Sequence, residues 1–206
     1  GGYPALIRGG ISATGIEGPV DFAVTAESQS QRGYDAVPQR QSVYAGGPEG
    51  FRDRIFTLNL GYTPVDGTRL SLFLRADTTY FGFNTLGAPT FDDSNSIGQT
   101  SSLLGRIGGT THLFDGKLET SAFVGQLQDD RRYLEPLAAA DPNQTSSDSR
   151  YHSYRTDAQW NNTLHLDDIA SVPGLSNSAM TFGYEYIGDT AKVRVNENFG
   201  GFPFGQ

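Results

Sequence analysis

The chain has 206 residues, a net charge of −8 and a pI near 4.7. Binding to nucleic acid needs clustered Lys and Arg, and the 15 basic residues are scattered, so nucleic acid is not an expected partner. The absence of cysteine and of long apolar runs excludes disulfides, thiolate metal sites and a transmembrane helix, but not membrane strands of about 9 to 11 alternating residues.

The first two predicted strands lie on either side of a Gly-rich turn at residues 15–19 (GIEGP). One face of the first strand, within residues 1–14, carries Ile7, Gly9, Ile11 and Ala13. In the second strand, at about 18–29, the matching face carries Val20, Phe22, Val24 and Ala26. A period of two is typical of a strand with one apolar and one polar face. The polar segment 30–53 predicts a long loop.

The clearest signal is a hairpin with strands at about 54–64 (RIFTLNLGYTP) and 69–80 (RLSLFLRAD and the residues after it). One face of this hairpin carries Phe56, Leu58, Leu60, Tyr62, Leu70, Leu72, Leu74 and Ala76. The turn at 65–68 contains Asp-Gly, which favours a tight hairpin connection. A second long loop, of about twenty polar and aromatic residues, is predicted for TTYFGFNTLGAPTFDDSNSIGQTS.

The remaining predicted strands repeat this arrangement. Strands at about 102–112 and 118–128 flank the tight turn 114–117 (FDGK), and a third long loop covers about 129–150. The seventh strand, about 152–166, is joined by the longer turn DDIASVPGLSNS to an eighth, which contains Met180, Phe182, Tyr184 and Tyr186. The final segment, VNENFGGFPFGQ, predicts another loop.

No segment has a helical period, so the predicted fold class is all-β, with about eight strands of about 10 to 14 residues in one domain, 1–206. Short turns alternate with loops of about 20 residues on one end. Such loops are uncommon in compact soluble domains and typical of up-and-down transmembrane barrels. We therefore predict an antiparallel up-and-down transmembrane β-barrel segment. A soluble β-sandwich would show the same alternation with its apolar face turned inward.

The charged residues of the strands agree with a second face in contact with water. They lie opposite the apolar rows: Asp21, Glu27, Arg75, Asp77, Arg106, Glu119, Arg155, Asp157 and Glu185. Aromatic residues near the short turns and the long loops predict two interfacial girdles, although ordinary β-propensity explains them equally well. These residues are Tyr62 and Phe114 at the turns, and Tyr80, Phe81, Tyr133 and Tyr151 at the loops.

Three passages carry a resemblance to a known family: GPVDFAVTAESQSQRGYDAV, RIFTLNLGYTPVDGTRLSLFLRA, and YRTDAQWNNTLHLDD followed by SAMTFGYEY. In pattern and order, over most of its length, the chain resembles the barrel of TonB-dependent outer-membrane receptors, most nearly the cobalamin-receptor-like branch. The resemblance implies capture of a scarce nutrient, a cobalamin or an iron-siderophore, and its TonB-energised uptake across the bacterial outer membrane.

The chain also departs from that family. The family has an N-terminal plug that contacts the TonB complex and a barrel of 22 strands, and neither is found in these residues. The last strand of a complete barrel usually ends in an aromatic residue, whereas this chain ends Phe204-Gly205-Gln206. We therefore expect a fragment of a larger, 22-stranded barrel.

No catalytic constellation is present in the sequence, so an enzyme is not expected and no cofactor is required. His112, His152 and His165 lie on separate predicted strands, without metal-ligand spacing. Carboxylates in or beside the predicted loops are candidates for Ca²⁺, which the resemblance also implies, with solvated loop charges as the plainer interpretation. They are Asp92, Asp93, Asp129, Asp130 and Asp141.

Ligand contact is predicted at loop aromatics, because an apolar platform with a few polar groups suits a bulky cofactor or siderophore. The candidates are Tyr80, Phe81 and Phe83 in one loop and Phe199, Phe202 and Phe204 in another. Packing of the loops on one another would explain the same residues. The expected partners are outer-membrane lipid, the TonB complex through the plug, and a small-molecule nutrient. The alternatives are a passive outer-membrane porin and a soluble secreted β-sandwich carbohydrate-binding module.

Overall fold

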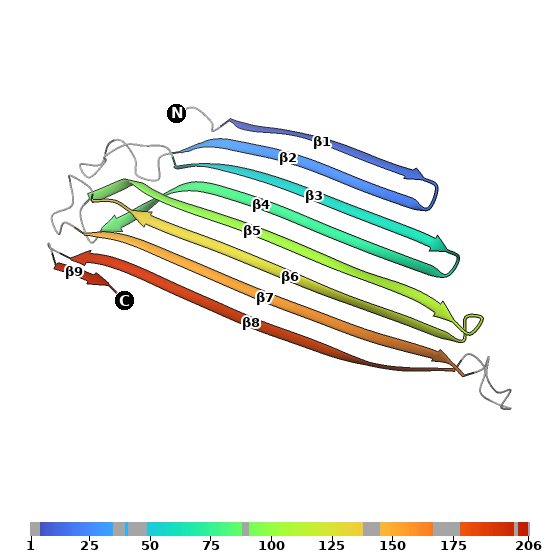
Figure 1. Ribbon diagram of the computed structural model, residues 1–206. Helices are drawn as coiled ribbons and strands as arrows, with labels where there is room; N and C mark the ends of the chain where they lie inside the picture. Colours follow the sequence, from blue (N-terminus) through green and yellow to red (C-terminus); the bar gives the residue numbers. More distant parts are fainter. Residues whose placement is uncertain are drawn as a thin grey trace.

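A single antiparallel sheet contains all the strands of the computed structural model (Figure 1). The structure describes residues 5–34, 40, 49–87, 91–137, 145–166, 178–199 and 202–205, without the side chains of 34, 84–87, 91–94, 199 and 202–205. Among these residues there is no helix, and so none long and apolar enough to cross a membrane. The all-β prediction is confirmed.

The strands lie side by side in chain order, each antiparallel to the one before (Figure 1). Eight of them are long and the ninth is short: β1 (Leu6–Glu17), β2 (Val20–Tyr34), β3 (Glu49–Val65), β4 (Thr68–Gly87), β5 (Phe91–Leu113), β6 (Leu118–Glu135), β7 (Ser146–His165), β8 (Ala179–Phe199) and β9 (Phe202–Gly205). The predicted up-and-down order is therefore correct.

The strands are longer than the sequence predicts. Strands β4 and β5 remain paired as far as Gly87 and Phe91, so most of the predicted second loop is a two-stranded ladder. Strands β6 and β7 likewise extend into the predicted third loop, and the predicted final loop contains the end of β8 and all of β9. In these extensions polar residues occur on both faces, beside aromatic residues such as Phe81 and Phe83, so the regular alternation ends while backbone pairing continues. The predicted loop positions 35–39, 41–48, 88–90 and 138–144 lie outside the described residues.

Among the described residues, glycines in left-handed conformations occupy three tight turns and one bulge, with Gly116, φ 89°, in the β5–β6 turn. Gly18, with φ 55°, lies in the β1–β2 turn, and Gly67, with φ 78°, lies in the predicted Asp-Gly turn between β3 and β4. Gly33, with φ 80°, lies where the register between β2 and β3 shifts. Glycine adopts positive φ without the steric cost that a Cβ imposes.

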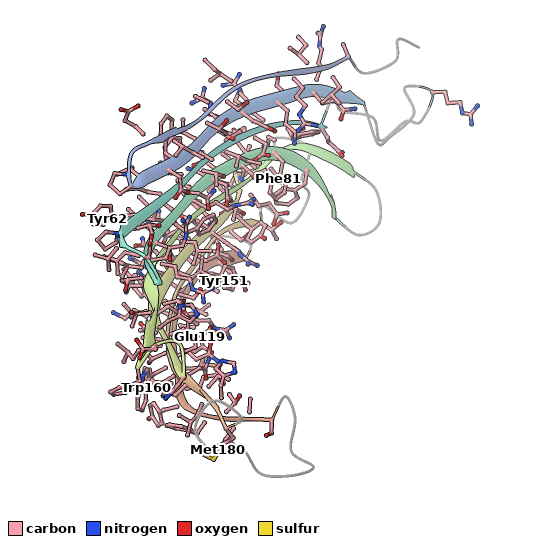
Figure 2. All side chains as sticks on the ribbon, turned by 90° about the vertical axis from the view of Figure 1, so that its right-hand side faces the viewer. Tyr62, Phe81, Glu119, Tyr151, Trp160 and Met180 are labelled. Atoms are coloured by element: carbon pink, nitrogen blue, oxygen red, sulfur yellow. The ribbon has the colours of Figure 1, made fainter. Side chains whose placement is uncertain are left out.

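The sheet is strongly bent, and its two faces differ in polarity. Figure 2 shows Tyr62 and Trp160 on the convex side and Phe81, Glu119 and Tyr151 on the concave side. Directly opposite residues of antiparallel strands share a face, so the register places the other side chains. The convex face carries an apolar band that includes Phe22, Val24, Phe56, Leu58, Leu60, Tyr62, Leu70, Leu72, Leu74, Leu103, Ile107, Val124, Trp160, Tyr184 and Tyr186.

The apolar band is uncovered within the described ranges. Leu70, Ile107 and Trp160, from the middle of the sheet, are 49%, 58% and 49% exposed. A row of large apolar side chains in this state is unusual for a protein surface in water, where extended exposed apolar patches mark interaction sites.

At the level of the apolar band, the charged residues of the strands lie on the concave face. All nine charged residues predicted to lie opposite the apolar rows share this face by register, as Glu119 does in Figure 2. Ion pairs connect the strands: Arg155 of β7 lies 2.7 Å from Asp189 of the neighbouring β8, and Arg69 of β4 lies 2.8 Å from Asp21 of β2, across Gly61 of β3. The guanidinium of Arg106 lies 3.4 Å from the ring centre of Phe123. The predicted division of the two faces is confirmed.

The sheet is open at both sides in the described part of the chain. Strand β1 pairs only with β2, and β9 only with β8. An edge strand presents unpaired backbone N–H and C=O groups that can accept a further strand.

Candidate functional site

Four aromatic side chains gather on the concave face, toward the end of the sheet away from the tight turns. Phe81 and Phe83 come from β4, Tyr133 from β6 and Tyr151 from β7. The ring centroids of Tyr133 lie 6.3 Å from Phe81, 6.2 Å from Phe83 and 6.0 Å from Tyr151, and those of Phe81 and Phe83 lie 6.0 Å apart. All three contacts of Tyr133 are edge-to-face, a favoured geometry for aromatic pairs. We call these four residues the aromatic cluster.

Gly98 of β5 allows the aromatic cluster to form across three strands. Phe81, Gly98 and Tyr133 lie in one cross-strand row, with the glycine in the middle. A Cβ at position 98 would lie 2.3 Å from Cζ of Phe81. The Phe81 ring therefore covers the glycine, and any larger residue would displace the ring from its contact with Tyr133.

A polar row borders the aromatic cluster on the side nearer the tight turns. Asp53 accepts hydrogen bonds from Oγ1 of Thr79 at 2.8 Å and from Nε2 of Gln29 at 3.2 Å. Arg131 lies 2.7 Å from Asp129, and its hydrogen bond to that carboxylate raises the pKa of the guanidinium above its ordinary value. Because these charges already have partners, the open surface of the site is mainly aromatic.

The exposed part of the aromatic cluster can hold a bulky, flat or partly apolar ligand. Tyr151 is 40% exposed, and the other three side chains are half-buried against the sheet. Rings anchored in this way offer apolar faces at little cost in side-chain entropy, and the two tyrosine hydroxyls add hydrogen-bonding groups. The arrangement suits noncovalent binding.

Two of the six predicted ligand residues, Phe81 and Phe83, belong to the aromatic cluster. The grouping of Tyr80 with them is wrong, because successive residues of a strand point to opposite faces and Tyr80 lies on the convex face. All three residues belong to β4 rather than to a loop.

The other three predicted ligand residues lie in the β8–β9 hairpin. Phe199 pairs with Phe202, and Phe204 with Glu197. Their side chains are outside the described part of the structure. In the sheet order this hairpin adjoins β7, which carries Tyr151, whereas β5, β6 and β7 separate it from Phe81 and Phe83 of β4.

The predicted calcium ligands do not form a common site in the described residues. Asp129 lies on the concave face with Arg131, whereas Asp130 lies on the convex face with His152, so these two carboxylates cannot chelate one ion together. Asp92 and Asp93 are in β5 without described side chains, and Asp141 lies outside the described residues. Within the described ranges no three His, Asp or Glu side chains come together as metal ligands. Calcium in the loops stays a prediction.

The predicted girdle at the loop side is wrong for three of its four residues. Phe81, Tyr133 and Tyr151 lie on the concave face, and only Tyr80 faces outward. Sequence reasoning treated Tyr133 and Tyr151 as girdle residues and did not group them with Phe81 and Phe83. The signal for Tyr151 was available, because it shares the alternation of Arg155 and Asp157 rather than that of Trp160.

No protein-family model matches the chain, and no curated protein matches it either. The strand pattern and the two faces of the sheet are therefore the basis for any functional conclusion.

Proposed function

We propose that the sheet is part of the wall of a transmembrane β-barrel in a bacterial outer membrane. The observation that carries this proposal is the curvature of the sheet, with the apolar band on the convex face and the charged residues of the same strand segments on the concave face. A barrel in lipid requires this arrangement, since its outside contacts acyl chains and its inside contacts water. A soluble sandwich instead packs its apolar faces against a second sheet.

The height of the apolar band supports a bilayer-spanning sheet. Along β4 the convex face is uncharged from Thr68 to Ala76. About nine residues at about 3.3 Å each span about 30 Å along the strand, or about 23 Å of height at a tilt of about 40°. The apolar belt of outer-membrane barrels is about 25 Å tall. The rest of β4, which includes Phe81 and Phe83, extends beyond the band.

The open edges are the reason to infer a larger barrel. In hydrocarbon each unpaired backbone group costs several kcal/mol, so a spanning sheet must close on itself. We infer that further strands pair with β1 and with the part of β8 that β9 leaves open, which agrees with the many-stranded barrel of the TonB-dependent receptors that the chain resembles.

Within that barrel, the function supported best is a receptor for a bulky nutrient. The aromatic cluster lies on the lumen side, beyond the apolar band, where a ligand arriving from outside the cell first meets the barrel. The ligand class that fits is a cobalamin or an iron-siderophore, with uptake energised by the TonB complex through a plug domain.

The second candidate is a passive porin, favoured by the charged and ion-paired concave face. Planar-bilayer conductance of the full native protein separates the two: a plugged receptor should show no steady open current, whereas a porin should show constant ohmic conductance.

Trp160 provides the test of membrane insertion, since it is the one tryptophan of the sequence and lies on the convex face. Brominated acyl chains should quench its fluorescence in reconstituted protein. The matched control is Phe123→Trp in a Trp160→Phe background, because Phe123 lies on the concave face. Equal quenching at the two positions would refute the proposed orientation.

The variant Tyr133→Ala tests ligand binding at the aromatic cluster. Its control is Tyr62→Ala, which removes a tyrosine ring from the convex face. The loss of a ligand-stacking aromatic ring costs about 1 to 2 kcal/mol, so the Kd for the recognised cobalamin or ferric siderophore should rise about tenfold in Tyr133→Ala only. Unchanged binding by Tyr133→Ala would remove the aromatic cluster from the ligand site.

A further inference from the structure

Basic side chains gather on the convex face of β6, β7 and β8, beyond the apolar band. The cross-strand row Gln99, Arg132, Arg150 and Arg194 runs over four strands, and the next row toward the band contains Ser101, Asp130, His152 and Lys192. One row further, Leu103 and Tyr154 belong to the convex face near the edge of the apolar band. We call Arg132, Arg150, His152, Lys192 and Arg194 the basic rim.

The basic rim has more positive groups than the neighbouring carboxylates neutralise. Asp148 accepts hydrogen bonds from Arg132 at 2.9 Å and from Arg150 at 2.8 Å, and these bonds hold the pKa of its carboxyl far below the ordinary value. Asp130 is paired with His152. Arg194 and Lys192 are exposed and, among the described residues, make no hydrogen bond or ion pair.

The strand register places two of the positive charges opposite each other, which destabilises the sheet. Arg150 lies directly opposite Arg194, and like charges directly opposite each other destabilise a sheet. An anion between the two guanidinium groups would reverse the sign of this interaction. Arginine is especially suited to phosphate, which it binds through two parallel hydrogen bonds.

The basic rim also borders a depression on the side of Arg132 and Arg150. A concavity of about 300 Å³ is lined by Gln99, Ser101, Asp130, Arg132, Arg150 and His152, among others. Gln99 and Ser101 add uncharged hydrogen-bonding groups. On the same face, the row of β4 to β7 nearest the tight turns carries Thr68, Thr111, Thr120 and Asn162, so strong positive charge is confined to one rim.

We propose that the basic rim binds the phosphate group of a lipid headgroup in the membrane leaflet at the loop side. The inference rests on the proposed membrane orientation of the apolar band. A headgroup at the basic rim would place its acyl chains over Leu103 and Tyr154, so one molecule satisfies both surfaces. A free phosphate ion would contact only the basic rim.

The test uses the full native protein in detergent, with native mass spectrometry to count retained lipids. The probes are phosphatidic acid, which carries a phosphomonoester, and phosphatidylcholine, which carries no net charge. The variant is Lys192→Gln with Arg194→Gln, two exposed residues without partners whose replacement should not disturb the fold. The control is Arg155→Gln, an arginine of β7 on the concave face.

The native protein and Arg155→Gln should retain phosphatidic acid in preference to phosphatidylcholine. The double variant should bind it roughly 20- to 30-fold more weakly, since each basic residue near an anionic membrane surface contributes about a fivefold preference. Equal retention by the double variant and the control would overturn the proposal. Displacement of the lipid by excess inorganic phosphate would also overturn it, because the site would then recognise a free anion.

The same samples, moved into vesicles with brominated lipid, separate this proposal from the proposed function. Quenching of Trp160 without a preference for phosphatidic acid means that the sheet spans the membrane and the basic rim is not a lipid site. Absence of quenching means that the membrane orientation itself is wrong, and the lipid site is then rejected with it.

Discussion

Replacement of Leu72 by arginine tests the assignment of the convex face to lipid. Leu72 lies in the middle of the uncharged part of β4, four residues from Thr68 and four from Ala76, between Leu60 of β3 and Ile107 of β5. In the proposed orientation, with about 3.3 Å per residue and a tilt of about 40°, about 10 Å of hydrocarbon would lie on either side. A guanidinium at this position has neither water nor a carboxylate on its own face within reach.

The expected cost is about 2 to 4 kcal/mol, the range for arginine at the midplane on the lipid side of a barrel. This is a factor of about 30 to several hundred in the folding equilibrium. Ser71→Arg is the matched control, because Ser71 is the preceding residue, lies on the concave face and is exposed. There the same charge extends into water, and the expected change is within about 0.5 kcal/mol.

The assay is equilibrium unfolding of the full native chain in phospholipid vesicles by urea, followed by the fluorescence of Trp160. The difference between the two variants is the decisive quantity, since both add one arginine to the same strand. If Leu72→Arg costs less than about 1 kcal/mol, or no more than Ser71→Arg, the convex face does not contact lipid and the reasoning from curvature is refuted.

Two further predictions concern glycines that the structure uses for close contacts. Gly98→Ala should cost about 1 kcal/mol and weaken ligand binding as Tyr133→Ala does, because the new Cβ displaces the Phe81 ring from Tyr133; urea unfolding and ligand titration measure both effects. Gly105→Ala, whose Cβ would meet only Cδ2 of Leu74 at 3.4 Å, should change neither. Gly33→Ala should cost about 1 to 3 kcal/mol, because the residue has φ 80° and its Cβ would overlap the carbonyl of Glu49. Gly9→Ala, with nothing within 4 Å of the new Cβ, should leave the urea midpoint unchanged. If Gly98→Ala and Gly105→Ala, or Gly33→Ala and Gly9→Ala, change the stability to urea equally, the close contact of the first glycine in that pair does not determine the effect.

Sequence alone determined which side chains share a face. In the hairpin at residues 54–80 the alternation separates Leu72 and Leu74 from Arg75 and Asp77, and the structure keeps that division across the sheet. This information is local, because a period of two needs only the extended backbone of one strand. The same locality explains the error over strand length. Where both faces are polar, as near Thr79 and Thr100, pairing continues without any alternation to reveal it.

The tertiary structure decided which face is convex and which residues meet across strands. An alternating pattern does not show which face of a sheet is covered by protein and which faces the surroundings. The sequence around Leu72 would be the same in a sandwich core and on a lipid-facing surface, and only the bend of the paired strands distinguishes the two arrangements. The aromatic cluster joins β4 to β6 and β7 over Gly98. The basic rim brings Arg150 opposite Arg194. Both depend on the register between distant segments, which backbone hydrogen bonds set and which no single stretch of sequence contains.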